Sequence, residues 1–454
     1  MASDQNKSNS PSLEEQIVSL TQTVQSNRES LDDATRFRTL KAARGLLGAL
    51  ESPPETAMRD VVLNPVLLTA IRMGVQLGVF QMIRDHQGEG ATTEQIASQS
   101  GASLIVVGGF IYFPPIMPTA IWSCNQILRL LAAAGYVSEA GAQTYKPSPL
   151  TMAMADGTLE AMTRACFDIG NYCSTYAPEY FRQNNNQFPT SAEDTPFQLA
   201  KNTPLSYFAW LGENPSLAKD FQQWMTLKQQ ATPNWVDWFD VQGNLLHGFR
   251  NQSDDVLLVD VGGGEGHYLH AFNDKYPDAP GRRILQDLPQ VISTINKTPK
   301  DTELMAHDFF TVQPVKGTKI CFSLVGLAGE FAFLFLYSIC MALHMLINPS
   351  GARAYYMHWI LHDWRDEQAH SILSHIVDAM EPGYSKLIIN DQIIPDRDCD
   401  FATACISIMM MLQVGAFERT EKQWRALLAS VGLKDVSFYQ PPGNGEGIIV
   451  ATKA

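Results

Sequence analysis

The sequence predicts a mainly helical, winged-helix-like domain followed by an α/β domain with a doubly wound parallel sheet. The sheet is indicated by Val256–Val261, a continuous apolar run that leads through a glycine turn into a helix. Further strand-like segments alternate with helical segments after this run, as a doubly wound domain requires. Two helices and a hairpin between residues 92 and 147 indicate the winged-helix-like arrangement.

Composition and charge restrict the class of protein. The chain has 454 residues, 45% of them hydrophobic, which is enough for two or three domains. Its formal charge is -14 and it has no run of basic residues, so we expect no nucleic-acid partner. The polar N-terminus lacks a signal-peptide pattern, which predicts a cytoplasmic location. Seven cysteines without a CxxC pair predict reduced thiols and no metal site.

The N-terminal third is predicted to be helical. Residues 1–57 form an arm with helical patterns at Leu13–Val24 and Leu40–Leu50, which we interpret as a solvated segment that packs on a partner. From Asn64 to Ile83 the apolar periodicity predicts one buried helix. Because the chain is acidic, we interpret residues 58–160 as a packing and dimerisation domain rather than a DNA-binding one.

Residues 161–454 combine an aromatic-rich helical region with the α/β domain. Most of the aromatic side chains between residues 160 and 240 are expected in the core, and a minority would suit an apolar pocket for an aromatic ligand. Later strands are predicted at Arg283–Gln286, Ala354–Met357, Lys386–Asn390, Val436–Phe438 and Ile448–Ala451.

The segment Asp260–His267, DVGGGEGH, follows the first strand of this sheet. Its glycines let the backbone approach a nucleotide-like ligand, whose anionic part the first N–H groups of the next helix can bind. A dinucleotide fingerprint would need glycine where His267 stands. The spacing instead favours S-adenosylmethionine, and Asp287, about 20 residues after the turn, is placed to accept hydrogen bonds from ribose hydroxyls.

A second group of candidate catalytic residues follows the predicted strand at Ala354–Met357. His358 and His362 lie at the carboxyl end of this strand, where ligands of parallel sheets bind. A histidine there can remove a phenolic proton near neutral pH if a carboxylate orients it. Asp391, at the end of the next strand, and Glu418 are the candidate carboxylates.

These motifs, in this order, resemble those of a known family. Leu258–Gly264, Gln286–Pro289, His307–Phe310, Ile360–Trp364 and Glu418–Glu421 look like the consecutive motifs of class I S-adenosylmethionine-dependent O-methyltransferases of the plant caffeate and flavonoid type. The sequence is most similar to the fungal secondary-metabolite branch of that family. The resemblance implies a Rossmann-like methyltransferase domain, an N-terminal dimerisation domain, a homodimer, and metal-free methylation of an aromatic hydroxyl on a phenolic or polyketide-like small molecule.

The resemblance also implies residue roles. His362 would be the general base, flanked by Asp391 and Glu418, although plant relatives usually have Glu where Asp391 stands. Seven residues would bind S-adenosylmethionine: Gly262, Gly263 and Gly264 at its methionine end, Asp287 at the ribose, Asp308 and Phe309 at the adenine, and His358. Five would line the acceptor pocket: Phe221, Met225, Ile408, Met409 and Gln413.

Two segments do not fit the family pattern. Residues 318–351 contain an apolar run, Ile320–Ile347, in which Glu330 is the one charged residue, and removing them restores a family-like sequence. Residues 107–126 interrupt a helical pattern in the same way. Codons for the residues at these boundaries can be written with intron-boundary letters, so we interpret both segments as translated introns. A genuine insertion or a membrane anchor is the alternative, since the longer run meets the length criterion for a membrane span.

Three other functions stay open from the sequence. A nucleotide-dependent oxidoreductase is disfavoured by His267, and its nicotinamide cofactor would distinguish it. A non-catalytic protein with the methyltransferase fold is disfavoured by His362 with two candidate carboxylates, and a turnover assay separates it. A membrane protein would show itself in cell fractionation. The sequence therefore favours an O-methyltransferase with no membrane partner.

Overall fold

The computed structural model describes residues 11–86, 88–100, 120–230, 232–252, 254–316, 351–442 and 445–454. The chain divides into two compact units, of which the smaller contains residues 11–57 and the larger contains residues 58–441 and 445–454. Residues 107–119 and 318–350 of the two unusual segments lie outside the described residues.

The smaller unit is helical. Its helices are α1 (Leu13–Asn27), α2 (Asp33–Leu50) and most of α3 (Pro53–Met58). Ser12 and Asp32 cap the first two helices by accepting hydrogen bonds from the backbone N–H groups of Glu15 and Thr35. The helical patterns predicted for this arm are therefore present.

The larger unit begins with the winged-helix-like domain. Its elements are α4 (Asn64–Gln76), α5 (Val79–Asp85), β1 (Ala91–Thr92), α6 (Thr93–Ser100), α7 (Ala120–Ala133), β2 (Val137–Gly141), β3 (Thr144–Pro147) and α8 (Pro149–Met154). The three strands pair antiparallel in the order β1-β3-β2. The single helix predicted from Asn64 to Ile83 is in fact two, because Gly78 has a left-handed φ of 67° between them.

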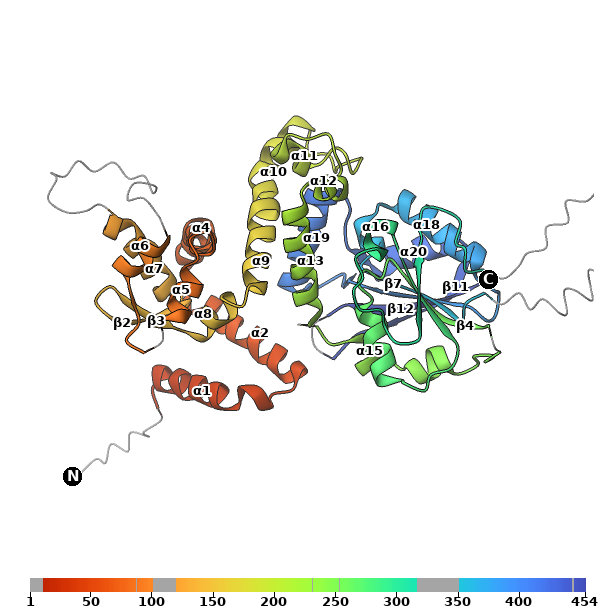
Figure 1. Ribbon diagram of the computed structural model, residues 1–454, viewed down its shortest axis with the longest axis horizontal. Helices are drawn as coiled ribbons and strands as arrows, with labels where there is room; N and C mark the ends of the chain where they lie inside the picture. Colours follow the sequence, from red (N-terminus) through yellow and green to blue (C-terminus); the bar gives the residue numbers. More distant parts are fainter. Residues whose placement is uncertain are drawn as a thin grey trace, which may run out of the picture. The chain divides into compact units, whose positions relative to one another are not determined.

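A helical layer follows along the chain (Figure 1). It consists of α9 (Thr158–Ala165), α10 (Tyr172–Gln183), α11 (Pro196–Lys201), α12 (Tyr207–Glu213), α13 (Pro215–Gln230) and, from much later in the sequence, α19 (Phe401–Val414). Aromatic side chains from three of these helices pack together, with Phe197 against Tyr207 and Trp210, and Tyr207 against Phe221. Most of the aromatic residues of this region thus form core, as the sequence predicted.

The α/β domain contains a seven-stranded sheet with the order β11-β12-β8-β7-β4-β5-β6. The strands are β4 (Val256–Val261), β5 (Arg282–Asp287), β6 (Thr302–Ala306), β7 (Ala354–His358), β8 (Lys386–Asp391), β11 (Leu433–Tyr439) and β12 (Gly447–Lys453). β6, β5, β4, β7 and β8 pair in parallel, and β12 and β11 complete the sheet antiparallel. A small parallel pair, β9 (Ile393–Ile394) and β10 (Arg419–Thr420), stands beside it.

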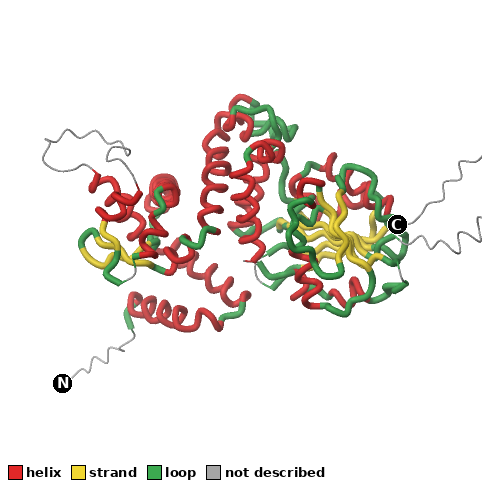
Figure 2. The backbone as a smooth tube through the Cα atoms, in the orientation of Figure 1, coloured by secondary structure: helices red, strands yellow, loops and turns green. Residues whose placement is uncertain are grey.

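Helices cover both faces of the large sheet (Figures 1 and 2). They are α14 (Trp235–Trp238), α15 (His267–Lys275), α16 (Pro289–Ile292), α18 (Asp366–Ala379) and α20 (Glu421–Ser430). Alternate residues of β7 show the two layers, since Tyr355 and Met357 pack with α18 and α20 while Ala354 and Tyr356 pack with α14 and α15. Burial on both faces explains why the strands appear in the sequence as continuous apolar runs.

No single helix of the described ranges is long and apolar enough to cross a membrane. One bent pair, residues 53–76 with 79–85, reaches the required length and composition together, at an angle of 63°.

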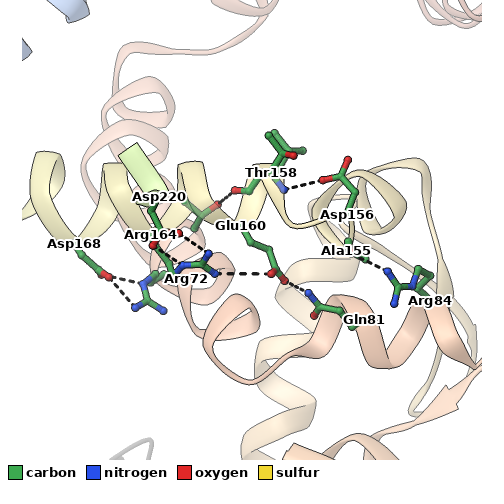
Figure 3. A network of polar contacts seen from close by, with 12 residues as sticks. Arg72, Gln81, Arg84, Ala155, Asp156, Thr158, Glu160, Arg164, Asp168 and Asp220 are labelled. Carbon is green, nitrogen blue, oxygen red and sulfur yellow. Dashed lines mark hydrogen bonds and ion pairs between the residues drawn. The ribbon is translucent and has the colours of Figure 1, made fainter. Parts of the chain in front are cut away.

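A polar network joins the winged-helix-like domain to the helical layer (Figure 3). Arg72 of α4 makes two hydrogen bonds of 2.9 Å to Asp168, which follows α9. Arg164 of α9 binds both carboxylate oxygens of Asp220 on α13, at 2.8 and 2.7 Å, and Asp220 is only 6% exposed. One ion pair thus joins α4 to the segment after α9, and another joins α9 to α13.

The buried end of this network should contribute to stability. We expect Arg164→Met to lower the free energy of unfolding by about 2 kcal/mol, because the Asp220 carboxylate is then left buried without its charged partner. Urea unfolding followed by tryptophan fluorescence measures the loss. Arg182→Met removes an arginine from the exposed pair with Glu179 and should cost less than about 0.5 kcal/mol. Equal losses in the two variants would show that burial of Asp220 does not matter.

Candidate active site

The turn after β4 requires glycine because of its backbone angles and because neighbouring side chains lie very close to it. Gly262 and Gly264 have left-handed φ angles of 72° and 58°. A Cβ on Gly262 would lie 2.5 Å from Ile360 Cδ1, and one on Gly263 would lie 2.3 Å from Leu285 Cδ1. Nothing lies within 4 Å of the Cβ position of Gly264. Side chains therefore pack closely on Gly262 and Gly263, whereas the space next to Gly264 is open.

Asp287, the last residue of β5, faces this turn. Its Oδ2 accepts a hydrogen bond of 2.8 Å from the Gly264 N–H, and its Oδ1 accepts one of 2.7 Å from the Leu288 N–H. Burial raises the pKa of the Asp287 carboxyl, and the two backbone hydrogen bonds oppose that rise. The structure thus brings Asp287 and the glycines together, as the sequence predicted.

The end of β6 adds the next two predicted residues. The His307 N–H donates to the Asp287 carbonyl oxygen at 2.8 Å, which joins this end of β6 to β5. Asp308 is exposed and accepts a hydrogen bond of 3.0 Å from the Phe310 N–H. Phe309 Cε1 lies 3.6 Å from the position that a Cβ on Gly262 would take. Asp308 and Phe309 therefore lie at the same edge of the sheet as the glycine turn.

Asp260, beneath the turn, is an additional site residue that the sequence analysis did not select. Its side chain is 1% exposed, and within the described part of the chain neither carboxyl oxygen has a hydrogen-bond partner. Burial, together with the negative charge of Asp287, raises the pKa of Asp260 to about 8. Its place near the end of β4, two residues before the first glycine of the turn, was the signal that could have identified it.

His362 lies in a short 3-10 turn, Leu361–Asp363, after β7. Its Nδ1–H donates a hydrogen bond of 2.8 Å to Glu418 Oε1, and both side chains are buried. Burial alone would lower the pKa of His362, but the charges of Glu418, Asp363 and Asp391 together raise it to about 10. In the free protein the imidazole is therefore protonated at neutral pH, whereas the sequence suggested titration near neutrality.

A carboxylate that was not predicted, Asp363, also contacts His362. Asp363 Oδ1 lies 3.5 Å from His362 Nε2, so the residue next in sequence, which was not predicted, is the second carboxylate in contact. Asp391 acts on His362 through its charge, and among the described residues its oxygens have no hydrogen-bond partner. Burial raises the pKa values of both aspartates.

Arg419 fixes the turn that carries His362. Its side chain is fully buried and donates to the carbonyl oxygens of Leu361 and Trp364, both at 2.7 Å, and to Asp366 Oδ1 at 2.9 Å. Glu418 directly precedes it, so one segment both orients the imidazole and holds the backbone of its turn.

His358, at the end of β7, is held by aromatic neighbours. Tyr268 hydroxyl and His358 Nε2 lie 3.0 Å apart, and the ring of Trp359 lies 4.4 Å from that of His358. Burial lowers the pKa of His358 well below its usual value, and the charges of Lys228 and His362 lower it further. This side chain is therefore a neutral imidazole at pH 7, unlike the basic residue that the resemblance implies at this position.

The predicted acceptor-pocket residues come from two helices. Phe221 and Met225 lie on one face of α13, and the next residue on that face is Lys228, whose Nζ is 3.4 Å from the centre of the Trp359 ring. On α19, Met409 and Gln413 approach Gly170, and Gln413 is 4% exposed. Ile408 is 53% exposed, so the structure does not enclose it. Lys228 was not predicted, and a single lysine on a helix gives no signal by itself.

The fold and these residues together define a class of protein. A doubly wound domain with this glycine turn beside a histidine on the neighbouring strand is that of an S-adenosylmethionine-dependent methyltransferase. No group of three or more potential metal ligands occurs within the described ranges.

Comparison with known proteins identifies the family. A profile of the O-methyltransferase domain matches residues 346–434. The O-methyltransferase mpaG of Penicillium brevicompactum is 30% identical over 430 residues, 94% of this chain and 95% of that protein. The O-methyltransferase asqD of Emericella nidulans is 34% identical over 393 residues, 86% of this chain and 87% of that protein. The structure of LepI in complex with SAM has a TM-score of 0.79 and 27% identity, and the match covers 98% of this chain and 100% of LepI.

The chain belongs to the O-methyltransferase family, and it is an S-adenosylmethionine-dependent enzyme. The resemblance drawn from the motifs is confirmed, and so is the predicted fold class.

Proposed function

We propose that this enzyme transfers a methyl group to a hydroxyl of an aromatic small molecule, phenolic or polyketide-like, in fungal secondary metabolism. The observation that carries the proposal is the His362–Glu418 pair, in which His362 lies in the turn after β7, the strand paired with β4. Ile360, two residues before His362, packs directly on Gly262. The general base and the cofactor turn are therefore adjacent, as methyl transfer to an acceptor oxygen requires.

The residues around the turn fit S-adenosylmethionine. The buried and unpaired carboxyl of Asp260 suits a ligand with positive charge, and the space above Gly264 is open. Gly262, Gly263 and Gly264 would bind the methionine end of the cofactor, Asp287 the ribose, Asp308 and Phe309 the adenine, and His358 a further part of it. When bound, S-adenosylmethionine supplies an already activated methyl group.

His362 would take the proton of the acceptor hydroxyl at Nε2, since Glu418 holds Nδ1. Glu418 fixes the orientation of the ring and stabilises its charged form, and Asp363 and Asp391 add negative charge. Because only the neutral imidazole accepts a proton, and its pKa is raised to about 10, we expect the rate to rise with pH.

Several features support an aromatic acceptor. Phe221 packs against Tyr207 and Trp224 and lies on α13, the helix that also carries Met225 and Lys228. The Nζ of Lys228 lies over the Trp359 ring. Met409, Met410 and Met411 are partly buried on α19, and such flexible apolar side chains suit an adaptable pocket wall. Phe221, Met225, Met409 and Gln413 would line the acceptor pocket, and Ile408 would contribute at its exposed edge.

The homodimer and the cytoplasmic location stay predictions. Apolar side chains at Val61, Leu63 and Val66 are between 55% and 73% exposed in a single chain, as a surface for a second copy requires.

We also propose that residues 107–126 and 318–351 are absent from the mature enzyme. Gly351 is tightly packed, because a Cβ there would lie 2.7 Å from the Ala379 carbonyl oxygen. Since Gly317 and Gly351 are the same residue type, removing residues 318–351 leaves a glycine at this position before Ala352. Removing residues 107–126 would put the residues up to Val106 in place of the first turns of α7, which begins at Ala120.

The cofactor assignment can be tested at Asp287. We expect Asp287→Ala to weaken S-adenosylmethionine binding by about 1–3 kcal/mol, because the ribose hydroxyls lose their charged acceptor. Isothermal titration calorimetry measures the change. Glu303→Ala, which removes an exposed carboxylate from the neighbouring strand β6, should leave the affinity unchanged. A folded Asp287→Ala protein with parent affinity would exclude Asp287 from the site.

The general base can be tested at His362. We expect His362→Gln to lower kcat by roughly 10²–10⁴ and to leave the affinity for S-adenosylmethionine near the parent value. The loss should be smaller with an acceptor whose hydroxyl is already ionised. In the parent enzyme kcat/KM should rise with pH, and Glu418→Gln should move this limb to lower pH because one charge that favours the imidazolium is gone. Glu421→Gln, an exposed neighbour, should leave the limb in place. Near-parent turnover of an un-ionised phenol by His362→Gln would end the assignment.

The proposal on the two segments has its own test. A variant that lacks residues 107–126 and 318–351 should show a higher soluble yield and a higher Tm than the full chain, because the long apolar run is removed. Differential scanning calorimetry gives the comparison, and a variant lacking only residues 318–351 separates the two contributions. If the full chain folds and the shortened chain does not, both segments belong to the protein.

A further inference from the structure

We propose that Lys228 is the binding group for an anionic oxygen of the acceptor, either a carboxylate or an ionised hydroxyl next to the one that is methylated. This inference rests on the proposed function and adds the class of substrate to it. It depends on where the ammonium group lies, on what surrounds it, and on its lack of a close partner among the described residues.

The ammonium group of Lys228 belongs to the site through Trp359. Its Nζ lies 3.4 Å from the centre of the Trp359 ring, and that ring is stacked 6.4 Å from the ring of His362. Trp359 itself has a left-handed φ of 51°, which is unusual for a large side chain. The Trp359 ring is thus near both the ammonium group of α13 and the imidazole of His362.

The nearest carboxylate does not hold Lys228 closely. Glu446 Oε1 is 3.8 Å from Nζ, beyond hydrogen-bond distance, and Glu446 accepts a hydrogen bond of 3.3 Å from Gln392 Nε2. In the part of the chain that the structure describes, Lys228 Nζ has this ion pair and the Trp359 ring as its contacts. Its three N–H donors therefore have capacity for a further acceptor.

The side chain of Lys228 is largely buried but not fully enclosed. Burial lowers the pKa of Lys228, and the charges of Glu446, Glu418, Asp391 and Asp363 oppose that change. The side chain nevertheless keeps 21% of its surface accessible. An apolar residue would fill this part of α13 without the cost of burying a charge, so the packing of the helix does not require a lysine. We infer that a molecule bound beside His362 reaches Lys228, because both side chains lie near the Trp359 ring.

The chemistry of the ammonium group selects the ligand. Lysine donates hydrogen bonds and accepts none, so its partner must be an acceptor, and a negatively charged oxygen gives the strongest bond. Aromatic acceptors carry such an oxygen either as a carboxylate beside the hydroxyl or as a second, ionised hydroxyl. Both offer the same group to Lys228, and two pairs of matched probes separate them.

The experiment measures binding of matched aromatic probes to the full chain loaded with S-adenosylhomocysteine. The first pair is 2-hydroxybenzoate and 2-hydroxybenzamide, which have nearly the same shape and differ in charge. The second pair is 4-nitrophenol, ionised at the pH of the assay, and neutral 4-nitroaniline. We expect at least one anionic probe to bind about tenfold more tightly than its neutral match. The pair that shows the preference identifies the source of the oxygen.

Lys228→Met should abolish that preference and leave the binding of the neutral probes unchanged. Lys219→Met removes a lysine from the exposed, opposite side of the same helix and should keep the preference. Equal binding of anionic and neutral probes by the parent, or a preference that survives Lys228→Met, would overturn the inference. So would an equal loss for charged and neutral probes in Lys228→Met, since that indicates a structural role.

The two proposals fail in different ways. If S-adenosylhomocysteine does not bind to the parent protein, the proposed function is wrong, and the proposed role of Lys228 in acceptor binding is wrong as well. If the cofactor product binds and the anion preference is missing, only the role of Lys228 is wrong.

Discussion

The parallel pairing of β4 with β7 determines where the chemistry of this chain takes place. Leu258, Val259 and Asp260 are paired with Ala354, Tyr355 and Tyr356, so the two strands end at the same edge of the sheet. The glycine turn follows one strand and the histidine turn follows the other. Any slip in this register would separate Gly262 from Ile360 and the glycine turn from His362.

Next to that edge, the segment Glu418–Arg419 contacts both the side chain of His362 and the backbone of its turn. Arg419 satisfies the two carbonyl oxygens of the His362 turn, which would otherwise be buried without donors, and Glu418 occupies Nδ1 of His362. Three further acidic side chains, Asp363, Asp391 and Glu446, lie close enough to influence His362 or Lys228. The raised pKa of His362 follows from this surplus of carboxylates over cations, which is a property of the whole cluster and not of one pair.

The sequence predicted the sheet and the first part of the site because their physical causes are local. Strands buried on both faces give apolar runs such as β4 and β8. The turn favours glycine because a Cβ on Gly262 or Gly263 would clash, and because Gly262 and Gly264 have left-handed φ angles. The break at Gly78 was missed because the apolar spacing continues across it into α5. Lys228 and Asp363 were missed for a different reason. Lys228 contacts Trp359, which is far away in the sequence, so no local pattern indicates that contact. Asp363 is next to His362 in sequence, but its contact with Nε2 depends on the local turn, which the sequence alone does not show.

Helix α13 connects the buried ion pair of the helical layer with the active site. Asp220 is held by Arg164 of α9, and Lys228, two turns further along the same helix, is placed on Trp359 in the active site. A helix of this length, about 12 Å between the two residues, transmits a shift of one end to the other with little bending. The contact between α9 and α13 therefore helps to set where Lys228 lies relative to Trp359. A substitution at Arg164 or Asp220, far from His362 in the sequence, is thus expected to be felt at the Lys228 end of the helix.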